Sequence, residues 1–374
     1  LAVAFQSQFF LAYLLPLLSL FFLAASTQTG RSCGFWLSCL AGVLSAGTMA
    51  NGVLALPLAF LLSVIIRAPL RQSLLLLLLS FLVAFFYFFD PSGSPGHGGL
   101  AQQLLNSPLK VLAFVVLYIG NPLGELFSPI AELTSPASYI FGTFALGVFF
   151  YLGITELNNN NPSSYARALL VFFLFVLVSA TATAGGRLSF GTEIALTSRY
   201  TTPSIMATAA LLVIFGTKEA SLDSDRLYMK RLAVLLMILM LVRQTWTLWN
   251  YGEESSRRMI GVLALSMSVR DSKYLERLYP DPDALLSKAK MAINRRDSIF
   301  NQYPYLGLDE GVGKHYKDVG AKLCKSDVLG IHPIDGVLGF VRVSGRIENQ
   351  NTKHEIGLIR FLDVKGSIVG YALS

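Results

Sequence analysis

Residues 73–89 read SLLLLLLSFLVAFFYFF and contain no charged side chain. A helix that crosses the hydrocarbon core of a bilayer needs roughly 20 largely apolar residues, and this run approaches that length. The whole chain is 53% hydrophobic and only 14% charged, with a mean hydropathy of +0.55. This composition lies outside the usual range of soluble domains. The sequence therefore predicts a mainly α-helical, multi-pass membrane protein.

Other apolar runs indicate about eight spans. A further apolar run, 108–121, is expected to be a re-entrant or surface helix, because counting it as a span would put the basic residues Lys218 to Arg231 outside, against the positive-inside rule. Between the second and third spans, Ala50 to Gly52 are expected to form a tight turn, which Asn51 and Gly52 favour because both residue types tolerate positive φ. The predicted spans are 8–26, 33–49, 53–67, 73–89, 138–155, 165–183, 203–217 and 230–249.

The distribution of charge divides the chain. Residues 1–250 hold 12 of the 30 Lys and Arg and 8 of the 23 Asp and Glu, so charge is concentrated in the last third. We predict a transmembrane domain over 1–250, a helical region over 251–303 and a small β-rich domain over 304–374. Together the last two form a small α+β domain. The strand 367–373 would be an open sheet edge, so we expect this domain to be truncated.

Orientation follows from the basic residues of the short loops. If residues 1–7 face outward, Arg31, the pair Arg67 and Arg71, and Arg167 all fall inside, as the positive-inside rule prefers. The same arrangement places residues 185–204 and the C-terminal domain outside the cytoplasm.

Several function classes are excluded by missing motifs. The sequence has no phosphate-binding loop, nucleophile elbow or dinucleotide fingerprint, and its histidines are too scattered for a metal site, so we expect no metal and no cofactor. The net charge of +7 includes basic residues of the membrane part, which lie beside spans, where anionic lipid headgroups explain them without a nucleic acid. Cys33, Cys39 and Cys324 are expected to be packing residues.

A polar stretch, GGRLSFGTEIALTSRYTTPS at 185–204, interrupts the apolar pattern. Arg187 and Arg199 could bind a phosphate on a lipid carrier, assisted by Tyr200, because guanidinium groups bind phosphate as a fork. Alternatively, an internal Arg–Glu pair only fixes the loop. Glu193 lies between two cations that would weaken it as a base, so we expect it to be their counter-ion rather than the catalyst.

The opening stretch FQSQFF places two amides, Gln6 and Gln8, at the start of the first span. They either mark the end of the helix at the membrane interface or face an outward cavity and hydrogen-bond a polar ligand such as a sugar.

Three stretches carry a resemblance to a known family: FQSQFFLAYLLPLLSL at 5–20, MANGVLALPLAFLL at 49–62 and GRLSFGTEIALTSRYTTPS at 186–204. In this order, and followed by a helical then β-rich domain, they resemble bacterial polytopic inner-membrane proteins related to the GT-C glycosyltransferases. The resemblance implies sugar transfer from a polyprenyl-phosphate carrier to an envelope glycan or lipid. It also implies a catalytic acidic residue in the first outer loop, which would precede Leu1.

Two other functions stay open at this point. A transporter or flippase of a lipid-linked glycan would carry ionisable groups deep within its spans and two related halves. A non-catalytic membrane scaffold would instead use the β-rich domain to bind an extracytoplasmic partner.

Overall fold

The computed structural model describes residues 2–89, 100–128, 130–159, 162–217, 223–279, 281–295, 297–315, 325–337, 339–348 and 358–373. The chain forms two compact units, Leu1–Arg243 and Gln244–Ser374.

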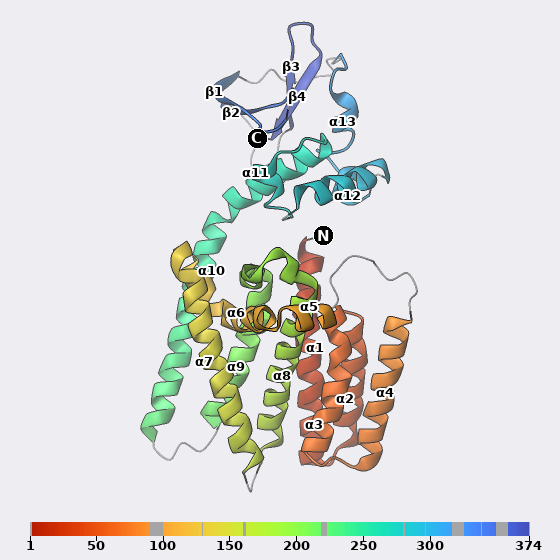
Figure 1. Cartoon of the computed structure of the whole chain (residues 1–374), viewed down its shortest axis with the longest axis vertical. Coiled ribbons are helices and arrows are strands. Elements are labelled where there is room, and N and C mark those ends of the chain that lie inside the picture. The colour runs from red at the N-terminus through yellow and green to blue at the C-terminus, as the bar shows by residue number, and fades with distance from the viewer. Residues whose placement is uncertain are drawn as a thin grey trace. The chain divides into compact units, whose positions relative to one another are not determined.

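The first unit is a bundle of helices (Figure 1). In it, α1 packs against α2, α3 and α8, while α6 packs against α7, α8 and α9. Its elements are α1 (Ala2–Thr29), α2 (Ser32–Ala46), η1 (Ala50–Leu54), α3 (Ala55–Ile65), α4 (Leu70–Phe88), α5 (Leu100–Asn106), α6 (Pro108–Phe127), α7 (Ala131–Leu157), α8 (Ser164–Arg187), η2 (Leu188–Phe190), η3 (Thr192–Leu196), η4 (Ser198–Tyr200), α9 (Thr201–Thr217) and the first part of α10 (Asp223–Ser266).

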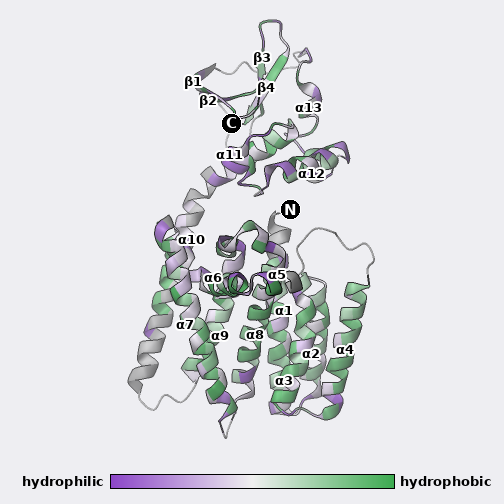
Figure 2. Cartoon of the chain, viewed as in Figure 1, coloured by the Kyte–Doolittle hydropathy of each residue, from purple (hydrophilic) through white to green (hydrophobic). Residues whose placement is uncertain are grey.

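Six helical stretches within the described residues are long and apolar enough to cross a membrane. Figure 2 shows the apolar character of the bundle helices, and the buried core includes three phenylalanines of α8, at 172, 173 and 175. On α4, by contrast, Phe86 and Phe88 are largely exposed, as suits side chains that face lipid. The expectation of a multi-pass membrane protein is confirmed at this level. The candidate spans are Gln8–Thr29, Leu70–Phe88, Pro108–Phe127, Glu132–Leu157, Ser164–Phe190 and Ser198–Thr217.

The count of eight spans is not confirmed. The predicted spans 33–49 and 53–67 correspond to shorter apolar helices, Ser32–Ala46 and Ala50–Ile65. The run 108–121 belongs to Pro108–Phe127, which meets the length and hydropathy of a span. The predicted span 230–249 lies inside α10, which continues to Ser266 through the predicted domain boundary at 250.

The turn between α2 and α3 forms for a different reason from the one expected. Neither Asn51 nor Gly52 has a positive φ; residues 50–54 form the 3₁₀ helix η1. A Cβ on Gly52 would lie 1.9 Å from the backbone oxygen of Ser45. Glycine is therefore needed for the close approach of the two chain segments and not for an unusual backbone angle.

Helices α6 and α7 pack with their backbones in direct contact. A Cβ on Gly120 would lie 1.8 Å from the oxygen of Ser138, and one on Gly142 would lie 2.0 Å from the oxygen of Val116. Small residues at such crossings let helices approach closely in a membrane, where dispersion forces and hydrogen bonds drive association. This crossing sets the position of α6, on which the candidate site described below depends.

The second unit combines short helices with two antiparallel hairpins, β1–β2 and β3–β4. At the β3–β4 turn, the Asp363 carboxylate accepts hydrogen bonds from the backbone N–H groups of Lys365 and Ser367, which stabilises the hairpin. The Asp281 carboxylate likewise accepts hydrogen bonds from the backbone N–H groups of Asp283 and Ala284 and so caps α12. The elements after α10 are α11 (Ser272–Leu275), α12 (Pro282–Arg295), η5 (Ser298–Asn301), α13 (Leu308–Gly311), β1 (Lys325–Pro333), β2 (Val341–Glu348), β3 (Leu358–Leu362) and β4 (Ile368–Leu373).

Candidate functional site

The polar stretch 185–204 is the link between α8 and α9, and it folds as three consecutive 3₁₀ helices, η2, η3 and η4. Gly191 separates the first two with φ of +99°, a backbone angle that side chains with a Cβ rarely adopt. In Figure 1 this link lies at the end of the bundle where α1 begins. We refer to residues 188–200 as the polar link.

Asn121 on α6 holds the backbone of the polar link. Its Nδ2 donates hydrogen bonds to the carbonyl oxygens of Ala195, at 2.9 Å, and Thr197, at 3.2 Å. Its Oδ1 accepts a hydrogen bond of 2.6 Å from the Thr201 hydroxyl at the start of α9. Asn121 is 1% exposed, so these three bonds satisfy an amide that would be costly to bury without partners.

Pro122 explains a second connection between α6 and α9. Proline has no backbone N–H, so the carbonyl of Tyr118, four residues earlier, lacks its usual partner within the helix. The Ser204 hydroxyl lies 2.5 Å from that oxygen and 2.8 Å from the oxygen of Tyr200. The Ser204 side chain of α9 therefore replaces the hydrogen bond that the Tyr118 carbonyl loses because of Pro122. Such replacement by a neighbouring side chain is typical of prolines tolerated in membrane helices.

Tyr200 is an anchor of the polar link. It is 5% exposed, and its ring centroid lies 4.9 Å from that of Tyr118, whose hydroxyl lies 2.9 Å from the Tyr13 hydroxyl on α1. The Arg199 guanidinium lies 5.3 Å from the centroid of the Tyr200 ring, a cation–π distance. Because the Tyr200 ring is buried, its route to a ligand is through the Arg199 guanidinium, which it contacts.

The charged groups of the stretch remain accessible. Glu193 is exposed, while Arg187, at the end of α8, and Arg199 are half-buried. Arg199 donates from Nε to the Thr197 hydroxyl at 3.3 Å. Within the described part of the chain, no carboxylate lies within 4.0 Å of either guanidinium, so the expected ion pair with Glu193 is not formed.

The two predicted glutamines lie in α1, at the same end of the bundle as the polar link. The exposed Gln8 donates from Nε2 to the carbonyl oxygen of Thr48, at the α2–η1 junction. This bond ties α1 to the α2–α3 turn. The side chain of Gln6 lies outside what the structure describes.

Asn121 is the residue that the sequence reading missed. It lies in the run 108–121, which was expected to be a re-entrant or surface helix and was given no part in the site, and its partners are 74 to 80 residues away. The signal in the sequence was an amide residue followed by proline inside an apolar helix. Proline leaves a backbone carbonyl of the helix without its usual N–H partner, so polar groups from elsewhere must bond to this part of the helix.

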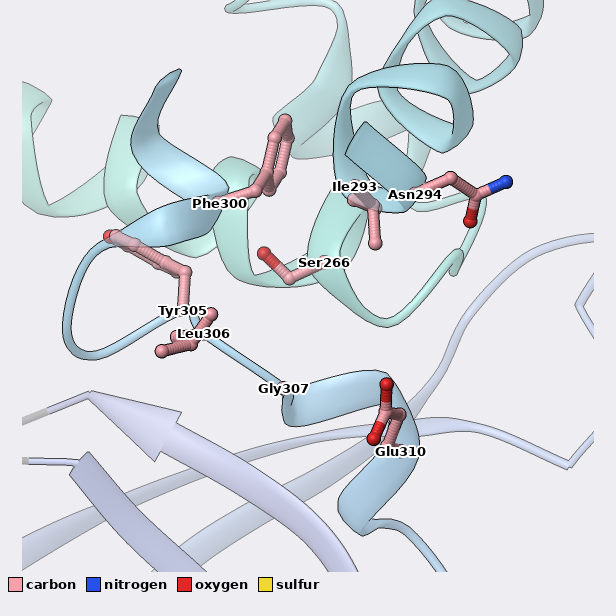
Figure 3. Close-up of a pocket in the computed structure, with 8 residues that line it drawn as sticks. All are labelled: Ser266, Ile293, Asn294, Phe300, Tyr305, Leu306, Gly307 and Glu310. Carbon is pink, nitrogen blue, oxygen red and sulfur yellow. The ribbon is translucent and has the colours of Figure 1, made fainter. Parts of the chain in front are cut away.

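The described residues of the second unit line at least two cavities. Figure 3 shows the first, of about 390 Å³, whose lining includes Glu310, with Asn294 directed away from its centre. A second, of about 450 Å³, is bounded by the end of α10 and both hairpins. Its wall includes a bidentate ion pair in which Arg342 donates from Nε and Nη2 to the buried Asp271, at 2.6 and 2.8 Å.

Among the described residues, no group of three His, Cys, Asp or Glu side chains could hold a metal ion. Comparison with family models, with curated proteins and with solved structures found no match to the chain.

Proposed function

We propose that the protein is a membrane glycosyltransferase of the GT-C type, which transfers a sugar from a polyprenyl-phosphate carrier to a glycan or lipid of the cell envelope. Arg187 and Arg199 bind the phosphate of the donor. One observation carries the proposal: two guanidinium groups without a carboxylate within 4.0 Å, among the described residues, flank the polar link of an apolar helix bundle.

The chemistry of Arg199 suits a phosphate. Guanidinium presents five N–H donors in a planar fork and stays charged. Its Nε is used by Thr197 and one face of the group lies over Tyr200, so the terminal nitrogens are left for phosphate oxygens. The exposed apolar side chains of the bundle suit a polyprenyl chain. The catalytic base is not assigned to Glu193.

The direction of the site follows from the basic loops. Arg31 lies between α1 and α2, Arg67 between α3 and α4, and Arg167 in the first turn of α8. These connections lie at the end of the bundle opposite to the polar link (Figure 1). The positive-inside rule favours the cytoplasm for that end. We therefore place the polar link, and with it the C-terminal domain, on the outer side of the bacterial inner membrane.

The test uses the full-length protein in lipid nanodiscs, with Arg199→Ala and Arg187→Ala variants and a labelled polyprenyl-phosphate sugar. We expect each variant to weaken donor binding by about tenfold or more, because each removes a charge-assisted contact to phosphate. The matched control is Arg71→Ala, which removes an exposed arginine in the first turn of α4 and should leave binding unchanged.

The outcomes separate the functions. Unchanged donor affinity in both Arg187→Ala and Arg199→Ala would remove the phosphate role. Wild-type binding of the donor without transfer to any acceptor, combined with movement of the carrier across the bilayer, would instead identify a flippase.

A further inference from the structure

We propose that Asn121 is the positioning residue of this site: it binds residues on both sides of Arg199, two backbone carbonyls before it and the Thr201 hydroxyl after it, and so holds the guanidinium where the donor phosphate binds. This inference rests on the proposed function for its ligand. The positioning itself can be measured without any ligand.

The hydrogen bonds of Asn121 bracket Arg199. Two of them hold the carbonyl groups of Ala195 and Thr197, before the arginine, and the third holds Thr201, after it. Both N–H groups and the oxygen of the amide are used, which exhausts its donors. Arg199 therefore lies on a short bridge whose two ends are attached to α6.

The same bridge holds the side chain of Arg199. Thr197, which is clamped through its carbonyl, accepts the Nε–H of Arg199 through its hydroxyl. Tyr200, on the other side, supplies the ring under the guanidinium and is itself packed against Tyr118 of α6. Release of the backbone would displace both groups that orient the guanidinium.

Helix α6 is a suitable support because it is fixed independently. Its Gly120 face is in backbone contact with α7, and its Tyr118 carbonyl is bonded by Ser204 of α9. Asn121 directly follows Gly120 and lies on the same helical turn as both contacts. A side chain on such a constrained turn has little freedom to follow the polar link if the link moves, and this gives the clamp its rigidity.

The experiment compares Asn121→Leu, which removes all three bonds, with Thr208→Val. The control removes a hydroxyl that bonds only the Ser204 carbonyl within α9. Each change is made in full-length protein that carries Ser198→Cys, at an exposed position beside Arg199, with the native cysteines replaced by alanine. The two readouts are the labelling rate of that thiol by a membrane-impermeant maleimide and the affinity for farnesyl phosphate in nanodiscs.

We expect Asn121→Leu to raise the labelling rate severalfold and to weaken farnesyl phosphate binding by about tenfold, the loss expected for one charge-assisted contact. We expect the double variant Asn121→Leu with Arg199→Ala to bind no more weakly than Arg199→Ala alone, because both changes remove the same interaction. The Thr208→Val control should move neither readout.

An unchanged labelling rate in Asn121→Leu would overturn the positioning role, whatever happens to binding. If Arg199→Ala binds farnesyl phosphate normally, the proposed function fails, and the labelling rate still reports whether Asn121 clamps the link. Should Asn121→Leu not fold, Thr201→Val removes one bond of the three. That variant must then show a smaller rise in labelling, and no rise would equally overturn the role.

Discussion

The contact between α6 and α7 makes the effect of a single methyl group predictable. In Gly120→Ala the added carbon would lie 1.8 Å from the oxygen and 2.6 Å from the carbon of the Ser138 carbonyl. Both are backbone atoms, so no side-chain rotation relieves the clash. The helices must separate by more than about 1 Å before the contact becomes an ordinary one.

The net cost follows from two opposing terms. Overpacking of this kind costs about 1–3 kcal/mol, and the separation also disturbs the neighbouring Asn121. Alanine in a helix interior gains about 0.5–1 kcal/mol over glycine. We therefore expect Gly120→Ala to lower the free energy of unfolding by about 2 kcal/mol, which corresponds to a fall of roughly 4–8 °C in melting temperature for a unit of this size.

The matched control is Gly147→Ala on α7, where an added Cβ would meet nothing within 4 Å. That variant should melt at or slightly above the wild-type temperature. The assay is thermal denaturation of purified full-length protein in one detergent, followed by the monodisperse fraction on size exclusion. If Gly120→Ala melts no lower than Gly147→Ala, the backbone contact does not carry the stability assigned to it.

Three further predictions concern individual bonds. Ser204→Ala removes the hydroxyl that bonds the Tyr118 carbonyl on α6, which Pro122 leaves without its usual partner. This variant should lower the free energy of unfolding by about 1–2 kcal/mol in the same melting assay. Asp271→Asn breaks the bidentate pair with Arg342 and should cost about 2 kcal/mol, less than for a fully buried pair because the Arg342 side chain is 25% exposed; faster hydrogen exchange in β2 would report it. Arg270 lowers the pKa of Asp283, so the stabilisation from this exposed pair is complete above the ordinary carboxyl pKa and is lost as pH falls through the lowered value, which a carboxyl NMR titration would follow.

Composition and local sequence pattern are sufficient to predict those elements whose structure depends on residues close to one another in the sequence. The span at 73–89 and the hairpin turn at Asp363 follow from apolar length and from a carboxylate that caps its own turn. The reason for Gly52 could not be read in this way, because the atom it must avoid belongs to Ser45 on another helix.

The candidate site shows the same limit. The sequence singled out Arg187, Glu193 and Arg199 from their charge alone, and their roles stay predictions. It suggested an ion pair that the fold does not form, because spacing along a chain of 3₁₀ turns does not determine which side chains meet. The clamp by Asn121 depends on contacts across 74 to 80 residues, which no local pattern contains.

The stretch YIGNPLG at 118–124 has a consequence for recognising distant relatives of this protein. Four of its residues are each constrained by contacts with other elements. The tyrosine contacts the Tyr200 ring and the Tyr13 hydroxyl, and the first glycine lies against the backbone of Ser138. The asparagine makes three hydrogen bonds, and the carbonyl left without a partner by the proline is bonded by Ser204 of α9. A homologue that keeps this packing is expected to keep these four residues even where the charged residues of its loop differ. Together with hydroxyl residues at 201 and 204, the four positions form a fingerprint of the scaffold that does not depend on the ligand.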